Sequence, residues 1–156
     1  MKIRYAAATA LVALTAAAAP AFADTIDCTK QGPSSLTCLR TAGWTETTGS
    51  EEADRLLGTN GQNLIQGDGG NDYISARGGD DEVTGGAGAD RIYLGAGDDV
   101  ATPGLDADRV YAGGGDDVIY ARDGERDVID CGSGRDRVIA DKVDSVKRCE
   151  RVQRSR

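Results

Sequence analysis

The sequence predicts an all-β fold in which short parallel strands stack into a solenoid. The prediction comes from a nine-residue repeat, whose seven clear units follow one another without a gap from Gly58 to Tyr120. Glycine recurs at the fourth place of the unit, aspartate at the sixth and an aliphatic residue at the eighth. A fixed period with three separately specified places is typical of a stacked, quasi-one-dimensional architecture.

The first 23 residues predict a cleaved secretory signal peptide. Lys2 and Arg4 precede an apolar stretch that runs from Tyr5 to Ala19, and the small-x-small sequence Ala21–Ala23 follows it. A membrane anchor is the alternative, but the apolar stretch is short for a membrane span and ends in a cleavage signal. We therefore expect a secreted, extracellular protein.

The repeat array is expected to cover residues 49–139, with degenerate units at both ends. The unit at 49–57 keeps Asp54 and Leu56 but lacks the inner glycines. Terminal coils of a solenoid need covers, because their outer faces have no neighbour. Residues 24–48 are therefore expected to form an N-terminal cap, with Trp44 and Leu39 over the core. Residues 140–156 are expected to form a C-terminal cap with Val143 and Val146, and a basic tail.

Four cysteines flank the array in two pairs, which in an exported chain indicates disulfides. About ten units at two per coil make about five coils, so the two pairs lie about 25 Å apart, beyond the reach of a disulfide. The sequence therefore predicts disulfide-bonded caps, with Cys28–Cys38 and Cys131–Cys149. A zinc site is the alternative, but it lacks both CxxC spacing and histidine.

Within each unit, the last three places read x-aliphatic-x and predict a strand of three residues. The first six places are rich in Gly, Asp and Asn and predict a turn of six. Two units close one coil of 18 residues, so the strands form the two facing sheets of a parallel β-roll. The expected core is one inward aliphatic ladder: Leu56, Ile65, Ile74, Val83, Ile92, Ala101, Val110, Ile119, Ile129 and Val138.

Such a thin core does not offset the entropy of ordering nine residues per unit, so the turns need another source of stability. Their donors are aspartate carboxylates and main-chain carbonyls, which are hard oxygen ligands. These ligands suit Ca²⁺, which accepts irregular oxygen cages. Zn²⁺ or Cu²⁺ would favour histidine or thiolate, and the chain has no histidine. Mg²⁺ demands a tighter octahedron and retains its waters.

Because like turns recur every 18 residues, sixth-place aspartates of successive coils are expected to lie one above another. An ion between them would be bridged by such pairs as Asp81 with Asp99, Asp99 with Asp117, Asp72 with Asp90, and Asp90 with Asp108. Without the ion, the stacked carboxylates repel one another. We therefore expect folding to be coupled to Ca²⁺ binding.

The unit GGAGADRIY at 85–93 matches every fixed place of the GGxGxDxUx nonapeptide, and its neighbours miss one or two. The array thus resembles the RTX, or hemolysin-type, calcium-binding family, whose turns bind Ca²⁺ in a parallel β-roll. The resemblance implies that the sixth-place aspartates are side-chain ligands. The candidate metal-site residues are Asp72, Asp81, Asp90, Asp99, Asp108, Asp117 and Asp136, with the glycines Gly70, Gly79, Gly88, Gly97 and Gly115. Asn63 replaces the aspartate of the first clear unit, where a weak or absent site is expected.

The chain carries 26 acidic and 18 basic residues, a formal net charge of −8, which disfavours nucleic acid and anionic membranes. The sequence is interpreted as a secreted calcium-ion-binding protein without catalysis, whose partners are calcium ions, with no nucleic acid and no membrane insertion. One alternative is a surface adhesive or matrix spacer. Another is a carboxylate-dependent hydrolase or lyase on a β-helical scaffold. Against an enzyme, acid pairs such as Asp80–Asp81 recur with the repeat, and no histidine is available for a catalytic dyad.

Overall fold

The computed structural model describes residues 37–41 and 44–155. The predicted signal peptide, most of the predicted N-terminal cap, Cys28 and the side chain of Leu39 lie outside the described residues, and so does the predicted Cys28–Cys38 disulfide. The described residues form fourteen strands and no helix. None of them therefore offers a helix that could span a membrane.

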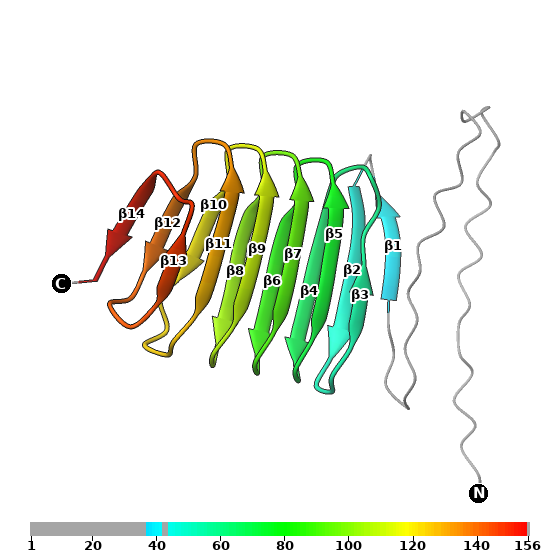
Figure 1. The fold of residues 1–156 in the computed structure, drawn as a ribbon. Coiled ribbons are helices and arrows are strands. Elements are labelled where there is room, and N and C mark those ends of the chain that lie inside the picture. Colours follow the sequence, from blue (N-terminus) through cyan, green and yellow to red (C-terminus); the bar gives the residue numbers. More distant parts are fainter. Residues whose placement is uncertain (1–36, 42–43, 156) are drawn as a thin grey trace, which may run out of the picture.

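The strands form two sheets that face each other along the whole stack (Figure 1). The eight-stranded sheet contains β1 (Thr37–Thr41), β2 (Trp44–Ser50), β4 (Asn63–Gly69), β6 (Glu82–Ala87), β8 (Val100–Leu105), β10 (Val118–Ala121), β12 (Arg137–Ala140) and β14 (Arg151–Arg154), in that order. The six-stranded sheet contains β3 (Arg55–Leu57), β5 (Tyr73–Gly78), β7 (Arg91–Ala96), β9 (Arg109–Gly114), β11 (Val128–Ser133) and β13 (Ser145–Lys147), also in chain order.

From β2 onward, successive strands of the chain alternate between the two sheets, and each pairs with the equivalent strand one coil later. Ile65 of β4 is in register with Val83 of β6, and Ile74 of β5 is in register with Ile92 of β7, so the coil is 18 residues long. Every pairing is parallel except that of β1 with β2. The predicted parallel two-sheet roll is confirmed. The parallel pairing also extends on both sides of residues 49–139, from β2 to β14.

The strands are longer than the sequence predicts. A typical strand covers six residues, from the seventh place of one unit to the third place of the next, so the predicted strand of three and turn of six were wrong. Glycines at the second place explain the difference. Gly95 and Gly113 have φ of +118° and +114°, which glycine adopts without a Cβ penalty, and they are in register across β7 and β9.

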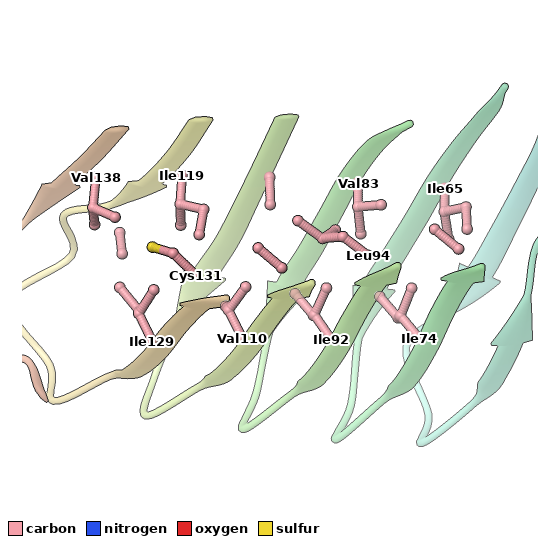
Figure 2. Close-up of a cluster of buried hydrophobic side chains, with 14 of the residues drawn as sticks. Ile65, Ile74, Val83, Ile92, Leu94, Val110, Ile119, Ile129, Cys131 and Val138 are labelled. Atoms are coloured by element: carbon pink, nitrogen blue, oxygen red, sulfur yellow. The ribbon is translucent and has the colours of Figure 1, made fainter. Parts of the chain in front are cut away.

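The core contains two inward ladders rather than one. All ten predicted aliphatic residues of the eighth place are buried. The first place supplies a second buried set, which the sequence reading missed: Ala76, Leu94, Ala112, Ala121, Cys131 and Ala140. Figure 2 shows how side chains from the two sheets point toward each other, with Leu94 and Cys131 between the eighth-place rows. Because the strands are six residues long, two of their residues face inward, and the core is wider than predicted.

The two ends differ from the expectation in detail. Trp44 is 36% exposed, so it does not cover the core, and Thr47 occupies the inward position in register with Ile65. Val143 is also exposed, whereas Val146 packs against the core as predicted. The predicted disulfide between Cys131 and Cys149 is confirmed, with a Cα–Cα distance of 5.2 Å. It joins the buried first-place ladder of β11 to the last turn of the chain.

Candidate metal site

The structure brings the sixth-place aspartates together in two buried columns, one along each edge of the roll. Each aspartate ends a turn immediately before a strand, and its side chain faces inward. The first column leads into the eight-stranded sheet and contains Asp81, Asp99, Asp117 and Asp136. The second column leads into the six-stranded sheet and contains Asp72, Asp90 and Asp108. Every predicted aspartate is therefore in a column, and none of them is more than 3% exposed.

One oxygen of each carboxylate is used by the fold itself. The Oδ1 of Asp99 accepts a hydrogen bond of 2.8 Å from the backbone N–H of Asp81, one coil earlier. Asp117 does the same for Asp99 at 2.9 Å. In the second column, Asp108 accepts from the N–H of Asp90 at 2.8 Å. The aspartates that were predicted to be vertical neighbours are thus linked by a continuous ladder through the stack.

In seven aspartates at the turns, the other oxygen, Oδ2, is buried in line with the columns and has no hydrogen-bond partner among the described residues. These are Asp81, Asp90, Asp99, Asp108, Asp117, Asp127 and Asp136. A buried carboxylate oxygen without a partner costs about 1–3 kcal/mol or more, because it loses its hydration and gains nothing in return. Native structures contain few such atoms, and a recurring row of them fits a cation-binding site.

Burial also raises the pKa of these carboxyl groups, and the backbone N–H bonds only partly oppose this effect. The pKa rises from 3.8 to about 6 for Asp81, Asp90 and Asp117, to about 7 for Asp99 and Asp127, and to about 8 for Asp108. Within a column, neighbouring carboxylates add to the rise, as Asp81 and Asp117 do for Asp99. Without a bound cation, Asp99, Asp127 and Asp108, which have the highest pKa values, would therefore retain protons near neutral pH.

The turn of Asn63 has an amide where the other turns have a carboxylate. The amide Nδ2 of Asn63 donates to the carbonyl oxygen of Gly61 at 2.5 Å and to Asp81 Oδ1 at 2.7 Å, and it lies 3.3–3.4 Å from the carbonyl oxygens of Ala76 and Thr59. Four oxygens thus surround a donor carried by the side chain itself. A cage of this composition suits a cation wherever aspartate replaces the amide, because the internal donor is then lost.

The fourth-place glycines set the distance between stacked turns. Gly97 has φ of +134°, and a Cβ at that position would lie 2.2 Å from the carbonyl oxygen of Gly79 in the turn below. Gly88 and Gly115 show the same close approach to Gly70 and Gly97. Asp106, at the fourth place of its unit, adopts the left-handed conformation, with φ of +77°. Only side chains that tolerate positive φ occupy these turns, and the stacked carbonyls stay near the columns.

No three acidic or sulfur-bearing side chains converge on one point in the described part of the chain. Each turn therefore offers one carboxylate oxygen and several main-chain carbonyls, rather than a carboxylate cluster. Ca²⁺ accepts such a mixed oxygen cage, because its coordination is irregular and includes backbone carbonyls.

Three further aspartates join the second column, and the candidate set did not include them. The N–H of Asp54 donates to Asp72 Oδ1, the N–H of Asp108 to Asp127, and the N–H of Asp127 to Asp144. The signal that could have identified Asp127 and Asp144 is the pattern Asp-x-aliphatic, which persists beyond the glycine-rich turns. The unit at 121–130 has ten residues instead of nine. Its extra residue lies within the turn, after which the column resumes.

The second column ends at Asp144, and protein groups take the place of a cation there. Both oxygens of Asp144 accept backbone N–H groups, from Asp127 at 3.1 Å and from Asp141 at 2.6 Å. The guanidinium of Arg154 donates to the carbonyl oxygens of Asp141 and Asp144 at 2.6 and 3.3 Å. The oxygens of this last turn thus already accept hydrogen bonds, unlike the Oδ2 atoms of the interior turns.

The fifth-place acids form a separate, more exposed row beside the first column. Asp80 accepts the N–H of Asp98 at 3.0 Å, and Asp98 accepts that of Asp116 at 2.8 Å. Arg135 ends this row with an ion pair to Asp116 at 2.5 Å, which lowers the pKa of Asp116. The acid pairs therefore serve turn stacking, and their arrangement provides no support for a paired-carboxylate catalytic site.

A parallel two-sheet solenoid with two columns of buried aspartates at its turns defines a calcium-binding β-roll. The chain belongs to the RTX calcium-binding nonapeptide repeat family, which it matches in four copies over residues 48–83, 74–101 and 102–138. These repeats bind Ca²⁺, and the family is a calcium-binding structural repeat of proteins that are typically exported. Searches of curated proteins and of solved structures gave no match.

Proposed function

We propose that this protein is a secreted calcium-binding module without catalysis, in which Ca²⁺ completes the two aspartate columns and folding is coupled to the metal. The observation that carries the proposal is the row of buried Oδ2 atoms without a partner. Ca²⁺ would supply the positive charge that these oxygens lack. The export signal predicted at residues 1–23 supports an extracellular location, where free Ca²⁺ is abundant enough for sites of modest affinity.

In this proposal, each ion is held by the Oδ2 of a sixth-place aspartate and by main-chain carbonyls of stacked turns. The predicted ligands are the seven aspartates of the candidate set and the carbonyls of Gly70, Gly79, Gly88, Gly97 and Gly115. Asp127 belongs with them, because its Oδ2 is also buried without a partner. The Asn63 turn and the Asp144 turn are expected to bind no ion. In each of them an N–H donor of the protein, the Asn63 amide or the Arg154 guanidinium, already contacts the oxygens that a cation would need.

Isothermal titration calorimetry with Ca²⁺ and with Mg²⁺ tests the binding itself. We expect several Ca²⁺ per chain and no comparable uptake of Mg²⁺, because a mainly carbonyl cage does not satisfy the strict octahedron of Mg²⁺. Proton release should accompany the uptake, since Asp99 and Asp108 hold protons with pKa values of about 7 and about 8 before the ion arrives. Equal binding of the two ions, or no binding of either, would contradict the proposal.

The raised pKa values predict an unusual pH dependence for the metal-free protein. In the folded, metal-free chain, Asp99 and Asp108 bind protons with pKa values of about 7 and about 8, against 3.8 when unfolded. The folded state thus binds more protons, and its stability falls as the pH rises from about 4 to about 8. Thermal unfolding in EDTA should therefore show a higher Tm at about pH 5 than at about pH 8. With saturating Ca²⁺ the order should reverse, because protons compete with the ion. A Tm in EDTA that rises with pH would contradict this assignment.

A surface adhesive or matrix spacer remains compatible with calcium binding, since a stacked roll is a rigid rod. It differs only in requiring a partner.

A further inference from the structure

The outer face of the six-stranded sheet between β3 and β9 has a composition unlike the rest of the chain. Its outward positions carry arginine, tyrosine, serine and glycine, and no acidic residue. The side chains of this face, which we term the Arg–Tyr strip, are Arg55, Tyr73, Ser75, Arg77, Arg91, Tyr93, Arg109 and Tyr111. The whole chain has a net charge of −8, so four arginines on one face without an acid require an explanation.

The tyrosines of the strip form a continuous stack across three strands. The rings of Tyr93 and Tyr111 are 4.9 Å apart and nearly parallel, and Tyr73 lies 5.4 Å from Tyr93. The guanidinium of Arg55 lies over the ring of Tyr73 at 5.4 Å. Because the rings cover one another's faces, their edges and hydroxyl groups remain available to a ligand.

Beside the tyrosine stack, Arg91 of β7 and Arg109 of β9 are in register on adjacent strands. Neither guanidinium forms an ion pair within the described residues, although like charges at neighbouring strand positions destabilise a sheet. The two arginines and Tyr73 border a surface hollow of about 220 Å³, whose lining also includes Asn71 and the buried Asp72 and Asp90. The exposed charges at this rim are the two adjacent guanidinium groups, and they indicate a surface that receives an anionic ligand.

We propose that the Arg–Tyr strip binds a linear acidic polysaccharide whose carboxylates lie on Arg91 and Arg109 and whose hydroxyls contact the tyrosine edges. The guanidinium fork matches the geometry of a carboxylate in a bidentate hydrogen bond. The strip runs across the strands, along the axis of the solenoid, and Arg91 and Arg109 occupy the same position in two successive coils. A polymer with regularly spaced anionic units therefore fits it better than a compact ligand does.

The surroundings of the strip favour a single polymer chain over a membrane or a nucleic acid. The turns after β5 and β7 carry the exposed acids Asp80 and Asp98, and the turn before β9 carries the exposed Asp106. A flat anionic membrane would meet these acids, whereas a single chain lies between them. Single-stranded nucleic acid binds through bases stacked on free aromatic faces, and here the tyrosine faces are already stacked on one another.

The proposal is tested with two double variants of the full chain that carry the same charge change. Arg91→Gln/Arg109→Gln removes the paired cations of the strip. Arg137→Gln/Arg151→Gln removes an equivalent registered pair on the outer face of the eight-stranded sheet, where no tyrosine stack accompanies the arginines. Circular dichroism in Ca²⁺ first establishes that all three proteins have the same β-sheet spectrum, so that a change in binding is not a change in folding.

Binding is measured by calorimetry in Ca²⁺ with hyaluronan oligosaccharides, which carry a carboxylate in every disaccharide, and with neutral dextran oligosaccharides. We expect the wild-type protein to bind hyaluronan and not dextran. The strip variant should lose about tenfold or more in affinity, and the control variant should change by less than about twofold. The affinity should also fall with added salt.

Several results would overturn the proposal: equal losses in the two variants, no hyaluronan binding by the folded wild-type protein, or tighter binding of single-stranded DNA or of anionic vesicles. Sedimentation of the wild-type protein and of the strip variant tests for self-association. A dimer that dissociates in the strip variant alone would assign the face to a second copy of the chain instead.

Discussion

Gly97→Ala is expected to abolish the folded array at any Ca²⁺ concentration. The new Cβ would lie 2.2 Å from the backbone carbonyl oxygen of Gly79, and the residue would have to keep a φ of +134°. Neither backbone can move without opening the stack on both sides. We expect a destabilisation of about 4–5 kcal/mol or more, measured by denaturant unfolding in Ca²⁺.

Gly61→Ala is the matched control, because Gly61 holds the same fourth place of its unit. Its added Cβ would have no neighbour nearer than 3.8 Å among the described residues, and its φ is not positive. The expected change is within about 0.5 kcal/mol. Similar losses for the two variants would show that close turn stacking does not limit the fold.

Asp99→Asn is expected to change stability in opposite directions with and without Ca²⁺. The amide oxygen keeps the hydrogen bond of 2.8 Å that Asp99 Oδ1 accepts from the backbone N–H of Asp81, while a neutral NH₂ donor replaces the buried Oδ2, which has no partner among the described residues. In EDTA at neutral pH, the variant should be more stable than the wild type by about 1–3 kcal/mol. In Ca²⁺ it should be less stable and bind fewer ions. The native Asn63 turn, whose amide fills its own cage, is the precedent in this chain.

Asp98→Asn controls for the change of charge, since Asp98 is the exposed neighbour of Asp99 and lies outside the buried column. It should leave the number of bound Ca²⁺ unchanged. Thermal unfolding and calcium titration of both variants, each in EDTA and in Ca²⁺, separate the two roles. A loss of stability in EDTA for Asp99→Asn would mean that Oδ2 already has a stabilising partner in the metal-free protein.

The sequence was sufficient to predict the two-sheet roll, because glycine, aspartate and aliphatic places recur at one period and fix both register and burial. The columns followed from the same period. The strand length did not, since glycine reads as a turn residue, although Gly95 and Gly113 continue the β pairing at positive φ. The second inward ladder was missed because the residues at the first place vary from Ala76 to Leu94.

Two features required the three-dimensional arrangement. At a period of nine, the seventh and ninth places show no fixed residue type, because successive units belong to opposite sheets. Only at the 18-residue period do Arg91 and Arg109 fall on one face. The end of the second column depends on Arg154, which reaches back to the carbonyl of Asp141 from a segment without the repeat.

The central claim is that calcium completes a fold whose turns are otherwise incomplete. Far-UV circular dichroism of the chain at neutral pH, in EDTA and then in excess Ca²⁺, with Mg²⁺ as the control ion, tests it most directly. We expect a loosened, marginally stable chain with a reduced β-sheet signal in EDTA and in Mg²⁺, and the full β-sheet spectrum in Ca²⁺. A β-sheet spectrum in EDTA that Ca²⁺ leaves unchanged would contradict the claim, because the core and the Cys131–Cys149 disulfide would then suffice for folding.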